Sequence, residues 1–291
     1  MGIPTPTTPE GKDGLAGLLA RPERAVIALD FDGTLASIVP DPDRARAYPG
    51  AVVALARLAP KVASVAVVTG RPARAAVRHG GFAAVPGLER LVVLGHYGAE
   101  RWDAGSASVR TPPPHPGVAA ARSELPLVLE RLGARPGARL AAVRVEDKGG
   151  QAVAVHTRQA EAPQAALQLL RGPLGELAAR HGLTLEPGRM VLELRPPGMD
   201  KGMALDAYLR ETDAGAVLYA GDDLGDLAAY GTVRRLRAGG LPGVLVCSAA
   251  VEEGESTVAE LAAQADLVVD GPGGVVALLN ALADALDARS A

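Results

Sequence analysis

Short apolar runs that stop abruptly at polar, glycine-containing loops constrain the fold of this chain more than any other feature. Ala25–Leu29 runs directly into Asp-Phe-Asp-Gly-Thr, Val62–Val68 stops at Thr-Gly-Arg-Pro, and Ala216–Ala220 stops at Gly-Asp-Asp. Stretches with a helical pattern separate these runs. Buried strands that alternate with helices are typical of a parallel sheet covered by helices. The sequence therefore predicts an α/β fold with a parallel-sheet core.

The middle of the chain has a different character. The prolines of residues 111–117 cannot continue a helix or a central strand, so they predict a domain boundary. The region beyond them predicts helix, strand, strand, helix, strand, strand, which favours an antiparallel sheet with helices on one side. We expect a core of residues 23–112 and 196–291, an inserted α+β domain of residues 113–195, and a disordered Pro/Thr-rich tail over residues 1–22.

The remaining expected elements of the core are strands at Gly243–Cys247 and Leu267–Val269 and helices at Ala51–Leu58, Arg71–His79, Lys201–Arg210, Val258–Ala265 and Gly274–Leu286. Those of the insert are helices at Val118–Leu132 and Pro163–His181 and strands at Leu140–Val145, Ala152–Thr157, Leu183–Glu186 and Met190–Leu194.

Composition narrows the class of protein. Hydrophobic residues make up 48% of the 291 residues, enough to bury a core, and the net charge of -3 lacks the basic surplus of a nucleic-acid-binding protein. No apolar run approaches the ~18–20 residues that a membrane span needs. Cys247 is the single cysteine, so an intrachain disulfide is excluded and a reducing compartment is favoured. We expect a cytoplasmic protein with no membrane or nucleic-acid partner.

The loop after the first strand, Asp30-Phe31-Asp32-Gly33-Thr34, carries two carboxylates. In open α/β sheets, ligands bind at the carboxyl ends of the strands. One carboxylate there can attack phosphorus, and the other can protonate the leaving alkoxide and then deprotonate water. Gly33 lets the backbone turn closely around a phosphate. The alternative interpretation is an ordinary turn rich in aspartate and glycine.

Two further loops offer partners for a phosphate. Thr69 follows a strand, so its hydroxyl can donate to a phosphoryl oxygen, and a helix beginning at Arg71 would direct its positive end at the anion. Asp200 can cap a helix that Lys201 opens, and the Lys201 ammonium could then pair with the nucleophile and the phosphate. Taken alone, the first loop is also an ordinary helix cap and the second an ordinary surface lysine.

The loop Gly221-Asp222-Asp223-Leu224-Gly225-Asp226 gathers several carboxylates over a few residues. Like charges at this spacing repel one another unless a cation is present. Mg²⁺ prefers hard oxygen ligands and keeps some of its waters, so it needs only one or two carboxylates in addition to phosphate. The loop predicts a Mg²⁺ site, with an acidic, solvated turn as the alternative.

In residue type and in order along the chain, these four clusters resemble the haloacid dehalogenase superfamily of phosphohydrolases. The resemblance implies a Rossmann-like core with a C2-type cap, a lid inserted between the second and third clusters. It also implies that Asp30 is the nucleophile, Asp32 the general acid/base, Thr69 the phosphate-binding hydroxyl and Lys201 the charge clamp.

The same resemblance implies a ligand set for Mg²⁺. The Asp222 and Asp30 carboxylates and the Asp32 backbone carbonyl would bind the metal, and Asp223 and Asp226 would shape its surroundings. Gly33 and Arg71 are expected beside the substrate phosphate.

Within that superfamily, the chain is similar to the trehalose-6-phosphate phosphatase family over most of its length. The stretches that carry this likeness are Glu146-Asp147-Lys148 with His156-Thr157-Arg158 (family pattern ExK…HYR), Glu193–Gly202 (E-x-RP…KG) and Gly95–Glu100 (GxHGxE). Departures from the family pattern are Thr157 in place of Tyr, Tyr97 in place of His, and Gly225 and Leu227 in place of Thr and Glu. The resemblance implies hydrolysis of trehalose 6-phosphate. For partners, we expect a monomer that is functionally paired with a trehalose-6-phosphate synthase.

Charged residues of the insert could bind the sugar. Charge-assisted hydrogen bonds from Glu146, Lys148 and Glu193 would hold the distal glucose, and a solvated salt-bridge surface is the alternative. Other candidate substrates are sucrose 6-phosphate, a glycosyl-glycerate phosphate and a pseudo-disaccharide phosphate. A phosphomutase and a non-catalytic sugar-phosphate sensor are the alternative classes. The complete retention of four motif residues argues against the sensor: Asp30, Asp32, Lys201 and Asp222.

Overall fold

The computed structural model describes residues 2–188, 190–249 and 256–290. The chain forms two compact units, which we call the core unit (Met1–Thr111 with Asp200–Ala291) and the inserted unit (Pro112–Met199). The boundaries expected for the insert were residues 113 and 195. No helix among the described residues is both long and apolar enough to cross a bilayer.

The core unit contains an eight-stranded sheet of order β12-β11-β10-β1-β2-β3-β4-β5. Its strands are β1 (Ala25–Leu29), β2 (Ser64–Val68), β3 (Leu91–Gly95), β4 (Glu100–Asp103), β5 (Ser108–Arg110), β10 (Ala216–Gly221), β11 (Gly243–Ala249) and β12 (Leu267–Asp270). Neighbours from β12 through β3 are parallel, and the β3–β4 and β4–β5 pairs are antiparallel. The predicted parallel-sheet core is confirmed, although the sequence interpretation did not include β3, β4 or β5.

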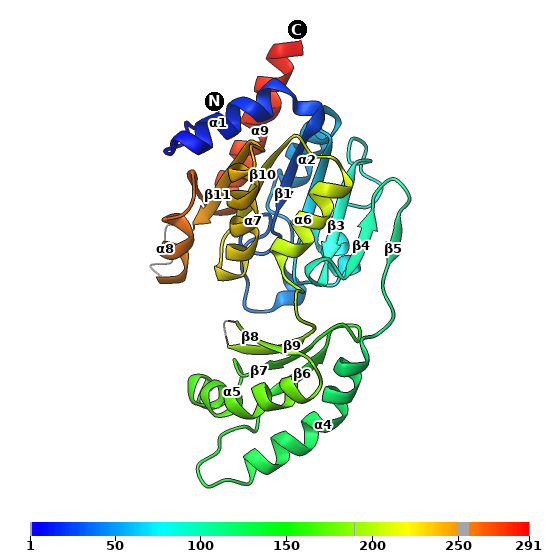
Figure 1. Ribbon diagram of the computed structural model, residues 1–291, viewed down its shortest axis with the longest axis vertical. Coiled ribbons are helices and arrows are strands. Elements are labelled where there is room, and N and C mark those ends of the chain that lie inside the picture. The colour runs from blue at the N-terminus through cyan, green and yellow to red at the C-terminus, as the bar shows by residue number, and fades with distance from the viewer. Residues whose placement is uncertain (1, 189, 250–255, 291) are drawn as a thin grey trace. The chain divides into compact units, whose positions relative to one another are not determined.

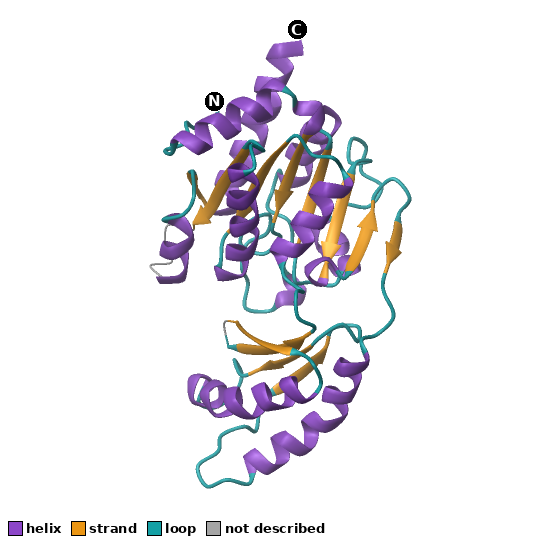
Figure 2. Cartoon of the chain, in the orientation of Figure 1, coloured by secondary structure: helices purple, strands orange, loops and turns teal. Residues whose placement is uncertain are grey.

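Helices cover both faces of this sheet (Figure 2). One face packs against α1 (Pro9–Ala20), α2 (Ala51–Leu58), α3 (Ala73–Gly80) and α9 (Gly271–Ser290). The other face packs against α6 (Lys201–Glu211), α7 (Leu227–Ala238) and α8 (Ser256–Ala262). In β1, Ile27 and Leu29 belong to the first cluster, and Val26 and Ala28 to the second. A strand buried on both faces explains the continuous apolar run in the sequence.

The N-terminal segment is a helix, so the predicted disorder of residues 1–22 is wrong for Pro9–Ala20. Thr8 caps this helix by accepting a 3.0 Å hydrogen bond from Gly11 N. The glycines of α1 face the core: a Cβ at Gly14 would overlap the backbone of Gly243. These glycines allow the helix to pack closely against the sheet.

The inserted unit has a four-stranded antiparallel sheet of order β6-β7-β9-β8 (Figure 1), as predicted. Its strands are β6 (Arg144–Asp147), β7 (Val153–His156), β8 (Thr184–Gly188) and β9 (Val191–Arg195), and its helices are α4 (Pro116–Gly133) and α5 (Pro163–Arg180). Both helices pack on one face of the sheet, against side chains that include Val153, Val155, Leu192 and Leu194.

Two strand boundaries differ from the prediction for backbone reasons. The strand expected from Leu140 begins at Arg144, because residues before it form a turn in which Val143 N donates to Leu140 O. The strand expected from Met190 begins at Val191, because Met190 has a φ of 57°.

Candidate active site

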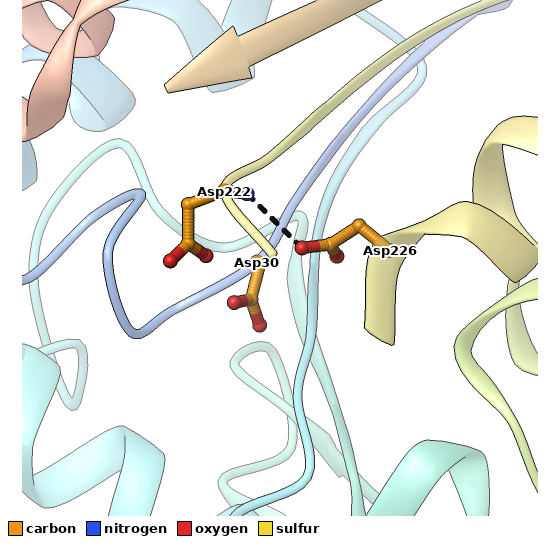
Figure 3. A group of neighbouring side chains, drawn as sticks. All are labelled: Asp30, Asp222 and Asp226. Atoms are coloured by element: carbon orange, nitrogen blue, oxygen red, sulfur yellow. Dashed lines mark hydrogen bonds between the residues drawn. The ribbon is translucent and has the colours of Figure 1, made fainter. Parts of the chain in front are cut away.

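Three buried aspartates meet at the carboxyl ends of β1 and β10 (Figure 3). These strands pair in parallel, with Leu29 opposite Ala220, so Asp30 and Asp222 leave the sheet side by side. Each of Asp30, Asp222 and Asp226 offers an oxygen within 4.8 Å of the others, and their exposed fractions are 4%, 8% and 0%. The structure therefore brings together residues from two of the predicted clusters.

Asp226 is held by hydrogen bonds to both carboxylate oxygens. Its Oδ1 accepts from Lys201 Nζ at 2.8 Å and from Tyr219 OH at 2.6 Å. Its Oδ2 accepts from the backbone N of Asp222 at 3.0 Å and of Asp223 at 3.2 Å. Asp226 thus fixes the shape of the acidic loop from within, while Asp223 caps the short helical turn that follows by accepting from Gly225 N.

Asp222 has an unsatisfied oxygen. Within the described part of the chain, its Oδ1 is buried and accepts no hydrogen bond. A Cβ at Gly33 would overlap the same carboxylate, and Gly33 has a φ of 77°. Leaving a buried carboxylate oxygen without a partner is costly, and a hard cation would satisfy it. The donor set of buried carboxylate oxygens therefore fits a divalent metal ion.

Crowding of the carboxylates changes their acidity. Burial raises the pKa of Asp30 to about 8, and nearby Asp226 adds to the effect while Lys201 opposes it. Burial also raises the pKa of Asp222 well above its usual range, with the Asp30 charge contributing next. A bound cation would reverse this effect, because it stabilises the ionised carboxylates.

Lys201 joins the nucleophile candidate to the acidic loop. Its Nζ lies 3.0 Å from Asp30 Oδ1 and 2.8 Å from Asp226 Oδ1. Burial alone would lower the pKa of Lys201, but Asp226 and then Asp30 outweigh it and raise that pKa well above normal. As predicted, Asp200 caps α6, accepting from Met203 N at 2.8 Å, and Lys201 opens the helix.

Asp32 lies outside this buried cluster and pairs with Arg71. Arg71 Nε is 2.6 Å from Asp32 Oδ2, and Arg71 Nη2 is 2.6 Å from Asp32 Oδ1. The helix expected to begin at Arg71 begins at Ala73, because Pro72 is extended, with a ψ of 138°. Its first N–H group, that of Ala73, donates to Glu100 Oε2 at 2.7 Å. The N-terminus of α3 is therefore capped by the carboxylate of Glu100.

Thr69 lies at the carboxyl end of β2, next to β1, and is 1% exposed. The loop that resembles the family's GxHGxE pattern holds this turn: Tyr97 N donates to Thr69 O, and His96 N donates to Arg71 O at 2.8 Å. The ring of Tyr97 also packs at Gly70, where a Cβ would lie 2.8 Å from its hydroxyl. Sequence reasoning identified this loop as a family feature without assigning it this supporting role.

Two of the three charged candidates of the inserted unit, Glu146 and Glu193, share one row of its sheet, and Lys148 follows the last residue of β6. Glu146 is opposite Ala154, and Ala154 is opposite Glu193 on the next strand. Leu192 and Leu194 pack against the helices, so Glu193 between them points to the opposite face. Glu193 is 5% exposed and forms an ion pair with Lys148, whereas Glu146 is exposed and accepts a 2.8 Å hydrogen bond from His156.

Two polar residues of the site were missed in the sequence. Tyr219 lies within the apolar run of β10, where nothing marks its bond to Asp226. Ser248 follows the last residue of the strand predicted at Gly243–Cys247, and its hydroxyl donates to Gly33 O at 2.7 Å. Ser248 contacts a loop that is distant in the sequence, and Tyr219 contacts the loop that follows its own strand, so the apolar pattern of the two strands gives no signal for either bond.

A family model described as trehalose-phosphatase matches residues 28–265. The chain belongs to the trehalose-phosphatase family. The match begins in β1 and extends past α8, so it includes both the acidic loops and the inserted unit. The resemblance in the sequence is thereby confirmed.

Mycobacterial members of this family are among the similar proteins. The trehalose-phosphate phosphatase of Mycobacterium avium is 34% identical over 300 residues, which cover 95% of this chain and 65% of that protein. The enzyme of Mycobacterium tuberculosis is 33% identical, with 93% of this chain and 64% of that protein covered. The chain thus spans slightly less than two thirds of the length of these relatives.

Solved structures share the fold. The C-terminal domain of Candida albicans trehalose-6-phosphate phosphatase aligns with a TM-score of 0.69 at 18% identity, covering 98% of this chain and 99% of that one. A haloacid dehalogenase-like hydrolase from Bacteroides thetaiotaomicron aligns with a TM-score of 0.52 at 16% identity, covering 88% and 98%. The expected α/β core with a parallel sheet and an inserted second unit is confirmed.

Proposed function

We propose that this chain hydrolyses trehalose 6-phosphate to trehalose and inorganic phosphate, through an aspartyl-phosphate on Asp30. The observation that carries the proposal is the buried Asp30 carboxylate, 3.0 Å from Lys201 and beside the unsatisfied Asp222 oxygen. Membership of the trehalose-phosphatase family supports the choice of substrate.

In the first step, the Asp30 carboxylate attacks phosphorus as the bond between phosphorus and the sugar oxygen breaks. Asp32 gives its proton to that oxygen, and the free sugar leaves. Water then attacks the aspartyl-phosphate and gives a proton to Asp32, and the bond between Asp30 and phosphorus breaks. Lys201 holds the Asp30 carboxylate in place, and its ammonium stabilises the charge that moves between carboxylate and phosphate.

Asp30, Asp222 and the backbone carbonyl of Asp32 would hold Mg²⁺ in this scheme. When bound, Mg²⁺ neutralises negative charge on the phosphate and lets the clustered carboxylates remain ionised. Asp226 and Asp223 keep the acidic loop in the shape that directs Asp222 at the metal. Gly33 leaves room beside the Asp222 carboxylate, and Thr69 and Gly33 would contact the phosphate.

We further propose that Glu146, Lys148 and Glu193 bind the sugar. The support is the common row of Glu146 and Glu193 on the face of the sheet opposite α4 and α5, the ion pair of Lys148 with Glu193, and the buried position of Glu193. Glu193 Oε1 accepts no hydrogen bond from the described residues, so a sugar hydroxyl would be a suitable donor. We propose that the protein is a cytoplasmic monomer that is functionally paired with a trehalose-6-phosphate synthase. In this proposal the inserted unit is the cap.

Phosphate release from a panel of sugar phosphates tests the function. We expect wild type to prefer trehalose 6-phosphate over sucrose 6-phosphate and glycosyl-glycerate phosphates, EDTA to stop the reaction and Mg²⁺ to restore it. Asp30→Asn should abolish turnover, whereas the matched variant Asp43→Asn, at an exposed position, should not. Near-normal turnover by Asp30→Asn would exclude Asp30 as the nucleophile. A preference for a different sugar phosphate would exclude trehalose 6-phosphate as the main substrate.

A further inference from the structure

Arg71 lies in the turn where the sequence predicts a phosphate contact, but its guanidinium is directed at Asp32. Arg71 Nε donates to Asp32 Oδ2 and Arg71 Nη2 to Asp32 Oδ1, both at 2.6 Å. This bidentate geometry uses both carboxylate oxygens and two of the three guanidinium nitrogens. Paired, charge-assisted hydrogen bonds of this kind fix orientation as well as adding energy.

The third nitrogen of Arg71 is anchored in the opposite direction. Arg71 Nη1 donates to Pro42 O at 2.9 Å and lies 3.5 Å from His79 Nδ1. The guanidinium carbon lies 5.7 Å from the centroid of the Phe31 ring, and the side chain is only 14% exposed. These contacts all lie within the core unit. Arg71 is therefore held rigidly, unlike a mobile arm that reaches for a substrate.

The backbone of Arg71 is held as firmly as its side chain. Its N–H donates to Thr69 Oγ1 at 3.1 Å, and its carbonyl accepts from His96 N at 2.8 Å. The guanidinium position is thus determined by the same turn that presents Thr69.

Asp32 is the more accessible partner of the pair, with a side chain that is 37% exposed. Each of its oxygens accepts one hydrogen bond from Arg71 and keeps a second lone pair. A rigid, mostly buried guanidinium therefore holds a carboxylate whose remaining lone pairs are open to a ligand. General acid/base catalysis requires such control, because the donor must lie within hydrogen-bond reach of the reacting oxygen.

We propose that Arg71 is a positioning residue for Asp32 and not a contact for the substrate phosphate. By fixing both Asp32 oxygens, Arg71 sets the carboxylate orientation from which a proton reaches the leaving sugar oxygen. This inference rests on the proposed function in one respect, the assignment of proton transfer to Asp32.

The leaving group tests the proposal. An alkoxide must be protonated as it leaves, whereas the p-nitrophenolate of p-nitrophenyl phosphate is a good leaving group without a proton. For Arg71→Met we expect kcat/KM to fall by about 10- to 100-fold with trehalose 6-phosphate and by a far smaller factor with p-nitrophenyl phosphate. Arg71→Lys keeps the charge without the planar fork, so it should restore little of the loss. Arg78→Gln, an exposed arginine on α3, is the matched control and should leave both substrates unaffected.

A double-mutant cycle separates positioning from binding. If Arg71 acts through Asp32, the Arg71→Met/Asp32→Asn variant should be no slower with trehalose 6-phosphate than Asp32→Asn alone. Three outcomes would overturn the proposal and favour a phosphate contact. They are an equal loss of kcat/KM with both substrates, additive losses in the double-mutant cycle, and full activity of Arg71→Lys.

Crystal structures give a readout that does not depend on turnover. We expect one Asp32 rotamer in wild type and a changed or divided one in Arg71→Lys; an unchanged Asp32 would contradict the inference. Failure of the proposed function appears in wild type, as no phosphate release from trehalose 6-phosphate. Failure of this inference appears only in the comparison between variants.

Discussion

Lys201 donates a 2.8 Å hydrogen bond to Asp226 in a pair whose side chains are 7% and 0% exposed. The pair links the first residue of α6 to the end of the acidic loop, and Tyr219 completes it from β10. Buried ion pairs contribute modest net stability when intact, because both charges lose their hydration. Removing one partner is more damaging, since the other stays buried with less compensation; without Asp226, Lys201 would keep only Asp30, 3.0 Å away, among the described residues.

We therefore expect Asp226→Ala to lower the free energy of unfolding by roughly 3–5 kcal/mol. The variant also removes the acceptor of the Asp222 and Asp223 backbone N–H groups, so the acidic loop should lose its shape. Urea denaturation measures the loss. Asp223→Asn is the control: Asp223 is exposed and asparagine can replace it as a cap, so its effect should stay below about 1 kcal/mol. Equal effects at both positions would contradict a buried role for Asp226.

Gly33 allows a test of the proposed metal site that leaves every carboxylate in place. A Cβ at Gly33 would overlap the Asp222 carboxylate, so Gly33→Ala should weaken Mg²⁺ binding by at least about tenfold, as measured by calorimetric titration of Mg²⁺ alone. Gly50→Ala is matched, because Gly50 also has a positive φ, of 87°, while its nearest Cβ neighbour is Val276 at 3.4 Å. Both variants should lose about 1–2 kcal/mol of stability from backbone strain. Unchanged Mg²⁺ affinity in Gly33→Ala would remove Asp222 from the metal site.

Glu100 makes stability depend on pH. His96 lowers the pKa of Glu100 most; burial opposes this, and the Ala73 backbone N–H lowers it further. The folded-state pKa therefore lies below the unfolded value of 4.5. The contribution of the Glu100 charge is fully present above that value and is lost as the pH falls through the folded-state pKa.

Glu100→Gln should consequently lower the thermal midpoint most near neutral pH, and the difference from wild type should shrink below about pH 4.5. Thermal unfolding across a pH series measures this difference. Glu211→Gln is the control at neutral pH. The Glu211 side chain, which pairs with Arg101, is 58% exposed, and exposed ion pairs contribute little to the free energy of unfolding. A constant difference between Glu100→Gln and wild type at all pH values would contradict the assignment.

The N-terminal helix should respond to a single methyl group. A Cβ at Gly14 would overlap Gly243, so we expect Gly14→Ala to lower the thermal midpoint and to expose α1 to proteolysis. The overlap should destabilise by about 1–3 kcal/mol. Gly231→Ala is the matched helical control: nothing lies within 4 Å of the added Cβ, and alanine favours a helix by about 1 kcal/mol over glycine. A rise in midpoint for both variants would show that α1 is not packed as described.

Much of the candidate site could be predicted because its residues occupy repeated positions in a simple fold. Asp30, Thr69 and Asp222 each directly follow the last residue of a strand, and parallel strands bring their carboxyl ends to one edge of a sheet. The capping of α6 by Asp200 was equally local, since an N-cap acts within one helical turn. The antiparallel sheet of the insert followed from the order of its strands and helices.

The sequence by itself determined the α/β core, the antiparallel insert and the strand ends at which the buried aspartates gather, because hydrophobic periodicity and strand–loop junctions are local properties. Only the tertiary structure decided the partners: Arg71 with Asp32, Tyr219 and Lys201 with Asp226, and α1 with the core sheet. Those contacts join residues from different elements, and their geometry depends on how side chains pack once the sheet has formed. The composition of the N-terminal segment suggests a flexible tail, and the position of Arg71 suggests a phosphate contact. Which contacts these residues make depends on the neighbours that the tertiary structure gives them.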